Sequence, residues 1–134
     1  MQIIFLTLLL PLAHAGWFTS TPEESFLAAG KSGDVEVVKK WLKNEGNIDT
    51  QDSSGTTALI NAAYYNQKEV AQFLINAGAN VEKRYELKDI YGDIITSSSR
   101  NALEYAAEYG HVEIIQMLNI KKASTRGSAL FLAA

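Results

Sequence analysis

A short pattern that occurs three times in this 134-residue chain limits its possible folds more than any other feature. The copies begin with glycine or asparagine and end in two apolar residues, at residues 33–38, 66–71 and 110–115. Their starts lie 33 and 44 residues apart, and a stretch that ends in two alanines precedes each copy. An Asn-Ile-Asp or Asn-Val-Glu triplet also follows the first two copies at a spacing of 33. Because three landmarks keep one register, the chain is predicted to consist of repeated structural units.

Each unit is predicted to form two short helices. Thr57 and Asn101 are expected to start the first helix of their units, because their side-chain oxygens can cap a helix N-terminus. The second helix carries apolar residues at helical spacing, with Trp41 among its core positions, and Gly78 suits the left-handed residue that ends such a helix. A polar turn over 52–55 leads into the next unit. One unit cannot bury its apolar stripe alone, so the units must stack into a solenoid.

On these residues the sequence resembles the ankyrin-repeat family. Residues 55–63 (GTTALINAA) match the family's opening G-x-T-P-L-H-x-A-A, and residues 76–81 (NAGANV) match its closing x-x-G-A-D-V. The resemblance covers roughly residues 25–134 and implies an all-α solenoid of stacked helix pairs with β-turn fingers. Ala58 and Ile60 replace the family's proline and histidine, so the hydrogen-bond link between adjacent turns is missing in this unit, and a less rigid solenoid is expected.

The expected domain has about three repeats and part of a fourth, preceded by a lead-in over residues 16–24. The ranges are 25–54, 55–98 with a finger insertion at 83–98, 99–127 and a partial unit at 128–134. Residues 128–134 resemble the opening of a further helix pair. Three explanations of this apolar end stay open. The chain is a shortened version of a longer repeat protein, or a partner or second copy covers the end. In the third, one short helix closes the third unit.

The finger insertion accounts for the 11 residues by which the second spacing exceeds the period of 33. It is rich in apolar side chains, including Tyr85, Leu87, Ile90 and Tyr91. Insertions into repeats often map to one functional face, and aromatic side chains there are good anchors for protein contacts. The alternative is a hairpin that packs back on its own solenoid.

The N-terminus has the pattern of a signal peptide. An apolar run over residues 3–12 precedes Ala13-His14-Ala15, so cleavage is expected after Ala15. The run is about half the length of a bilayer-spanning helix, so no stable membrane insertion is expected after cleavage. The alternative is an apolar first element of the fold. Trp17 and Phe18 follow the cleavage point and either pack onto the first unit or form a separate contact.

Composition argues against most catalytic chemistry. The net charge of −3 offers no positive field for nucleic acid, and the absence of cysteine excludes disulfides, thiol nucleophiles and cysteine-ligated metals. His111, the single histidine after residue 15, stands at a helix start, where a structural role is expected. With no phosphate-binding loop and no Ser/His/Asp set, we expect no enzyme activity, no cofactor and no metal site.

The resemblance implies a recognition surface formed by the residues after each Ala-Ala pair and beside the turns. The residues expected to contact a partner there are Tyr64, Tyr65, Glu108, Tyr109 and Arg100, together with the four apolar residues of the insertion. The tyrosines supply large contact areas with polar tips; alternatively, they only cover the Ala-Ala groove. The expected function is that of an exported binding module, periplasmic or secreted, that masks or inhibits an envelope enzyme. The alternative is an intracellular scaffold or host-directed effector whose N-terminus is not cleaved.

Overall fold

The computed structural model describes residues 20–85, 91 and 99–133, with 126–133 described by their backbone alone. Three predictions fall outside these residues: the signal peptide with its cleavage point after Ala15, the roles of Trp17 and Phe18, and the positions of Leu87 and Ile90.

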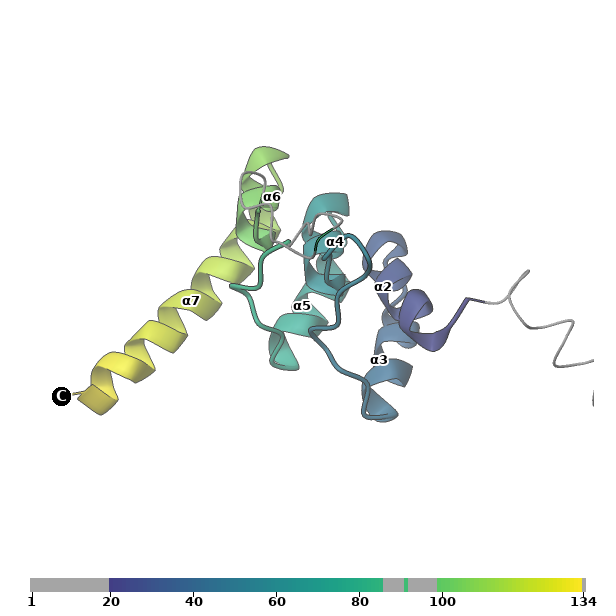
Figure 1. Cartoon of the computed structure of the whole chain (residues 1–134). Helices are drawn as coiled ribbons and strands as arrows, with labels where there is room; N and C mark the ends of the chain where they lie inside the picture. Colours follow the sequence, from purple (N-terminus) through teal and green to yellow (C-terminus); the bar gives the residue numbers. More distant parts are fainter. Residues whose placement is uncertain (1–19, 86–90, 92–98, 134) are drawn as a thin grey trace, which may run out of the picture.

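The described chain forms three helix pairs joined by loops. The pairs are α2 (Pro22–Ser32) with α3 (Val35–Lys43), α4 (Ala58–Tyr65) with α5 (Lys68–Asn76), and α6 (Ala102–Glu108) with α7 (Val112–Ala133). Figure 1 shows the pairs side by side, with α2 and α3 at one end of the stack and α6 and α7 at the other. The only β pairing in this part of the chain is an isolated bridge between Arg84 and Asn101. The expected all-α stack of helix pairs is confirmed.

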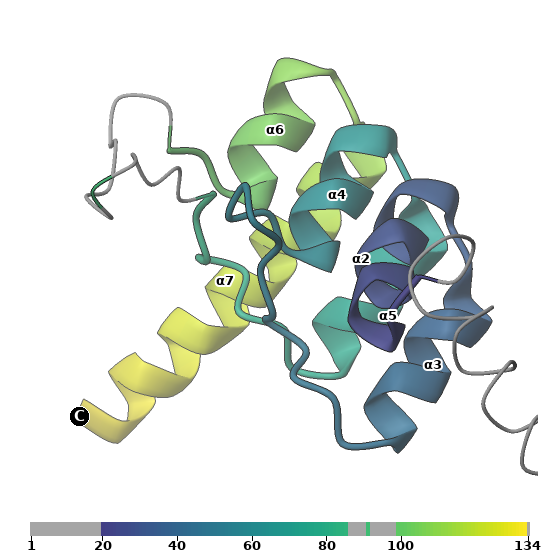
Figure 2. The ribbon, with the colours of Figure 1, turned by 45° about the vertical axis from the view of Figure 1, so that its right-hand side comes forward.

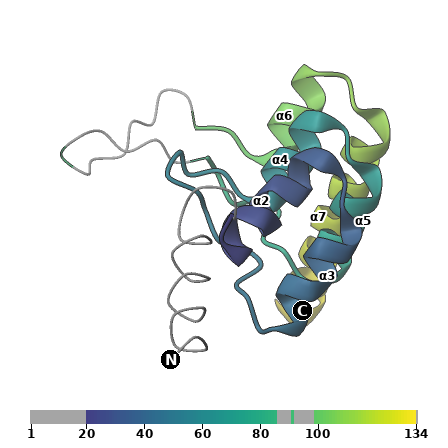
Figure 3. The same ribbon diagram turned by 90° about the vertical axis from the view of Figure 1, so that its right-hand side faces the viewer.

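The helices form two rows. Helices α2, α4 and α6 pack in one row and α3, α5 and α7 in the other, and the loops between pairs project from one side (Figure 3). Two backbone hydrogen bonds close the first loop as a turn, from Gly55 N to Asp52 O at 2.9 Å and from Asp52 N to Thr56 O at 3.0 Å. The carboxylate of Asp49 accepts a hydrogen bond from Asn80 N at 2.8 Å, which ties this loop to the next one.

The helix ends follow the sequence signals. The side chains of Thr57 and Asn101 accept hydrogen bonds from the third residue of their helices, at 3.1 and 2.9 Å, as predicted for N-caps. Gly78 has a φ of 96°, and the N–H of Ala79 donates to Leu74 O at 3.0 Å. This Schellman arrangement satisfies the last carbonyls of α5, so Gly78 ends the helix as expected.

We call α2, α4 and α6 the inner helices and α3, α5 and α7 the outer helices. Small residues let the inner helices approach one another closely. The alanine pairs supply buried residues on α2, α4 and α6, and Gly30 is so close to α4 that a Cβ there would lie 2.5 Å from Ala58 O. In place of the missing link between turns, the buried Asn61 side chain donates from Nδ2 to Leu27 O at 3.1 Å. A side chain at another position of the repeat therefore ties the first two units together.

Two expected boundaries differ from the structure. Helix α2 begins at Pro22, capped by Thr21, so it includes three residues assigned to the 16–24 lead-in. Helix α7 continues without a break through residues 128–133, which the sequence assigns to the opening of a separate fourth unit. The stretch before it contains one glycine and no proline, and a lone glycine costs a helix only about 1 kcal/mol. The end of α7 extends beyond the rest of the stack (Figures 1 and 2). Neither α7 nor any other described helix combines the length and apolar character that crossing a membrane requires.

Candidate functional site

The ends of the inner helices bring four tyrosines together. Buried Ala62 and Ala63 anchor the middle of α4, and the next two residues, Tyr64 and Tyr65, reach the surface. Tyr105 on α6 and Tyr109 just after it come to the same place. We call Tyr64, Tyr65, Tyr105 and Tyr109 the tyrosine surface.

Tyr64 is the centre of the tyrosine surface. Its ring centroid lies 4.8 Å from that of Tyr65, 5.6 Å from that of Tyr105 and 4.7 Å from that of Tyr109, with tilted or edge-on rings. Aromatic pairs in such geometries stabilise each other by about 0.5–1.5 kcal/mol beyond the burial of their area. Tyr64 is nevertheless 38% exposed, and Tyr65 and Tyr109 are each 48% exposed. The rings are therefore held in place by one another while much of their surface faces solvent.

Hydrogen bonds also hold the tyrosine rings in place. The Tyr109 hydroxyl donates to the Tyr64 hydroxyl at 3.4 Å. His111 Nε2 lies 3.0 Å from the Tyr64 carbonyl oxygen, to which it donates, and its ring stacks on Tyr109. His111 thereby joins the end of α4 to the start of α7, which is the structural role that its position in the repeat indicates.

Proton affinities of two tyrosines are shifted. Burial, and then the neighbouring phenol of Tyr85, raise the pKa of Tyr105 above its ordinary value of 10.0. The hydrogen bond to Tyr64, and then burial, raise the pKa of Tyr109 above the same value. Both groups are therefore neutral at physiological pH and can donate or accept hydrogen bonds at the surface.

The charged residues beside the tyrosine surface mostly pair with each other. Arg100 forms an ion pair with Glu108, and its guanidinium carbon lies 5.8 Å from the ring centroid of Tyr105. This contact with Glu108 raises the pKa of Arg100. Arg84 forms a bidentate ion pair with Glu104, in which its two terminal nitrogens lie 2.6 and 3.2 Å from the two carboxylate oxygens. Lys31 lines a pocket together with Tyr64 and Tyr65 and forms no ion pair with any described residue, so its ammonium group can pair with an anionic ligand there.

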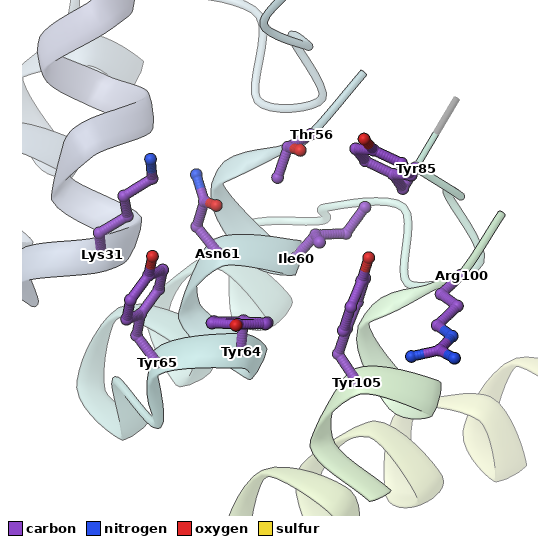
Figure 4. Close-up of a pocket in the computed structure, with 9 residues that line it drawn as sticks. All are labelled: Lys31, Thr56, Ile60, Asn61, Tyr64, Tyr65, Tyr85, Arg100 and Tyr105. Atoms are coloured by element: carbon purple, nitrogen blue, oxygen red, sulfur yellow. The ribbon is translucent and has the colours of Figure 1, made fainter. Parts of the chain in front are cut away.

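An open pocket of about 470 Å³ borders the tyrosine surface. It lies between the inner helices and the loops, and Figure 4 shows its lining. The residues that line it are Lys31, Thr56, Ile60, Asn61, Tyr64, Tyr65, Tyr85, Arg100 and Tyr105. Ile60 and Asn61 are buried residues of its lining, so the pocket combines one aliphatic and one amide side chain with phenol hydroxyls and two cations.

Within the described part of the insertion, residues 83–85 and 91, Tyr85 lines this pocket. Tyr85 N donates to Arg100 O at 2.8 Å, next to the bridge between Arg84 and Asn101, so the two ends of the insertion are held together. This pairing places Tyr85 beside the pocket. Tyr91 is 85% exposed and does not line it.

Sequence reasoning missed Tyr105. This residue lies four positions before Tyr109, and residues at that spacing share one face of a helix. In the repeat register it corresponds to Asn61, which also lines the pocket. Either signal could have identified it. That Tyr64, Tyr65, Tyr109 and the other expected residues contact a partner stays a prediction.

Within the described parts of the chain, no three histidine, aspartate or glutamate side chains gather as a metal would require. The described residues of the site offer contact with aromatic rings, hydrogen bonding by phenols and pairing with an ammonium group.

Comparisons with known proteins agree with one another, since the matching family model and the similar proteins all contain ankyrin repeats. A family model described as "Ankyrin repeats (3 copies)" matches residues 25–133. The human "Ankyrin repeat and SOCS box protein 3" is 36% identical over 90 residues, which are 67% of this chain and 16% of that protein. The ankyrin repeat protein YahD of Escherichia coli is 39% identical over 59 residues, 44% of this chain and 29% of that protein. This chain thus spans less than a third of the length of either relative.

Proposed function

Since this chain belongs to the ankyrin-repeat family, we propose that it acts as an exported binding protein that holds its partner at the tyrosine surface and the adjoining pocket. Ankyrin repeats are generally protein–protein interaction modules, and proteins of this family are typically non-catalytic. The partner that we propose is an envelope enzyme, which the module masks or inhibits by occupying its surface.

One observation supports the tyrosine surface as the face that binds the partner. Tyr64, Tyr65 and Tyr109 come from two adjacent units, are fixed by contacts with one another and still expose between 38 and 48% of their surface. Tyrosines ordered in this way lose little conformational entropy on binding, and tyrosine is enriched at the residues that dominate binding energy. Lys31 at the pocket adds a site for an acidic side chain of the partner.

The export part of the proposal rests on the apolar run and the Ala13-His14-Ala15 pattern. N-terminal sequencing of the protein purified from its own cells tests it. We expect Gly16 as the first residue, in protein recovered from the periplasm or the medium. An intact Met1 in cytosolic protein would contradict export and favour the scaffold or effector alternative.

The binding part is tested by pull-down from the same cells with three baits. The baits are the unchanged protein, a variant with Tyr64, Tyr65 and Tyr109 changed to alanine, and a control with Gln72→Ala and Ile120→Ala. The control residues are exposed on the outer helices α5 and α7. We expect one partner to be captured by the unchanged and control baits and lost with the tyrosine variant. Equal capture by all three baits would refute the assigned face.

A further inference from the structure

The outward side of the first helix pair carries an apolar pocket. Helices α2 and α3 lie at the end of the stack, and the other described helices pack against their opposite side (Figure 1). A pocket of about 530 Å³ is lined by residues of both helices, and most of its lining is apolar. Pro22, Val37 and Trp41 supply apolar groups, and Ser20 also lines it. The end of a solenoid needs a cover, because an open apolar face lowers solubility.

The main wall of this pocket is rigid. The Trp41 ring stacks on Phe26, with the centroids 5.3 Å apart and the planes 18° from parallel. Its Nε1 donates to Asn47 O at 2.9 Å. At Gly46, a Cβ would lie 2.2 Å from a carbon of this ring, so only glycine fits beside it. The tryptophan is thus fixed before anything enters the pocket.

The chain before α2 starts at this pocket. Thr21 and Glu24 form a reciprocal capping box, and Ser20 Oγ lies 2.8 Å from Ser25 Oγ. In many helices the residue before the N-cap and the fourth helical residue are apolar and pack together. Here those positions are the two serines, whose hydrogen bond sets the direction of the chain but adds no large apolar group.

Two aromatic residues lie within reach. Phe18 and Trp17 are two and three residues before Ser20. At about 3.3–3.6 Å per residue, the Cα of Trp17 is within about 10 Å of that of Ser20. We propose that Trp17 and Phe18 bind in this pocket and cap the first unit. Their own chain is the favoured occupant, since a short tether raises the local concentration of these side chains to about the millimolar range.

Fluorescence tests this assignment directly, because Trp17 and Trp41 are the two tryptophans of the chain. The chain is purified as its own cells make it, with Trp41→Phe to leave Trp17 as the only reporter. We expect Trp17 in the folded protein to emit at shorter wavelength than in urea and to resist quenching by acrylamide. Adding Val37→Lys to the wall should move the emission toward that of the unfolded chain. Folded emission equal to that in urea would overturn the proposal, as would an N-terminus that begins after Phe18. Shielding that disappears on dilution would assign the pocket to a second copy and overturn it too.

A double-mutant cycle provides a second readout with tryptophan retained at position 41. The unfolding equilibrium constant is measured in urea for Trp17→Ala, Val37→Ser and the double variant. We expect the double variant to differ from the product of the single effects by about threefold or more, as contacting residues do. The control cycle combines Trp17→Ala with Val112→Ser in place of Val37→Ser. Val112 is 60% exposed and lies at the other end of the stack, so the two effects on the unfolding equilibrium should be additive. Additive effects in both cycles would overturn the proposal.

Discussion

Replacing Gly30 by alanine sets two effects of opposite sign against each other. Gly30 is a buried residue inside α2, and alanine is more favourable than glycine in a helix by about 1 kcal/mol. The added Cβ would however lie 2.5 Å from Ala58 O and 2.9 Å from Asn61 Cβ on α4. Cβ contacts under 3.0 Å are essentially never seen in proteins. Because the nearest atom belongs to the backbone, no side-chain rotation relieves the contact, and α2 must move away from α4.

Overfilling a packed interface of this kind costs about 1–3 kcal/mol. Since the contact is with backbone, which cannot rotate away, we expect the upper part of this range. After the gain in helix propensity, Gly30→Ala should lower the free energy of unfolding by about 1–2 kcal/mol. The melting temperature should then fall by about 3–5 °C for each kcal/mol in a chain of this size.

The assay is urea and thermal unfolding followed by circular dichroism. The matched control is Ala28→Gly, an exposed residue of the same helix, which should cost about 1 kcal/mol from propensity alone. We therefore expect both exchanges to destabilise the protein, although they change the residue in opposite directions. A higher melting temperature for Gly30→Ala would refute the close approach of α2 and α4.

Three further predictions follow from single contacts. Glu45 ends α3 with a φ of 60°, at the position of the repeat where Gly78 ends α5, so Glu45→Gly should stabilise the protein by about 1 kcal/mol in urea unfolding; a loss of stability would contradict this. Because the pKa of Tyr105 is raised, the folded state holds the phenolic proton more tightly, so the contribution of Tyr105 to stability should be fully present below pH 10 and be lost as the pH rises further, which makes the alkaline fall less steep in Tyr105→Phe. An equally steep fall would contradict it. The ion pair between Lys68 and Glu113 is half exposed, so Glu113→Gln should change stability by less than about 1 kcal/mol, with no difference left in 1 M salt.

Most of the fold could be predicted from the spacing of the repeated pattern in the sequence. Thr57, Asn101 and Gly78 are local signals whose effect depends on a few neighbouring backbone groups, so the sequence alone was enough to place these helix ends. The continuation of α7 through residues 128–133 does not follow from the sequence, because resemblance to a helix opening does not show whether the preceding helix ends first.

The candidate site was harder to predict. Tyr64, Tyr65 and Tyr109 could be placed from the repeat, but the contacts of Tyr105 and Tyr85 depend on how α6 and the start of the insertion pack against α4. Those contacts join residues from different units, which periodicity along one chain does not report. The ion pair between Arg100 and Glu108 lies within one unit, but the sequence predicts a partner contact for each residue and does not indicate that they pair with each other.

The central claim is that the tyrosine surface holds the partner. Its most direct test is calorimetric measurement of the dissociation constant for the partner identified by pull-down, with Tyr65→Ala compared with the unchanged protein. Tyr65 is the best probe because it is 48% exposed and its ring contact is with Tyr64, so its loss should leave the fold intact. We expect binding to weaken about fivefold or more, as for an interface residue that contributes over 1 kcal/mol, while Ile120→Ala has no effect. A dissociation constant unchanged by Tyr65→Ala, and by the triple tyrosine variant, would contradict the account.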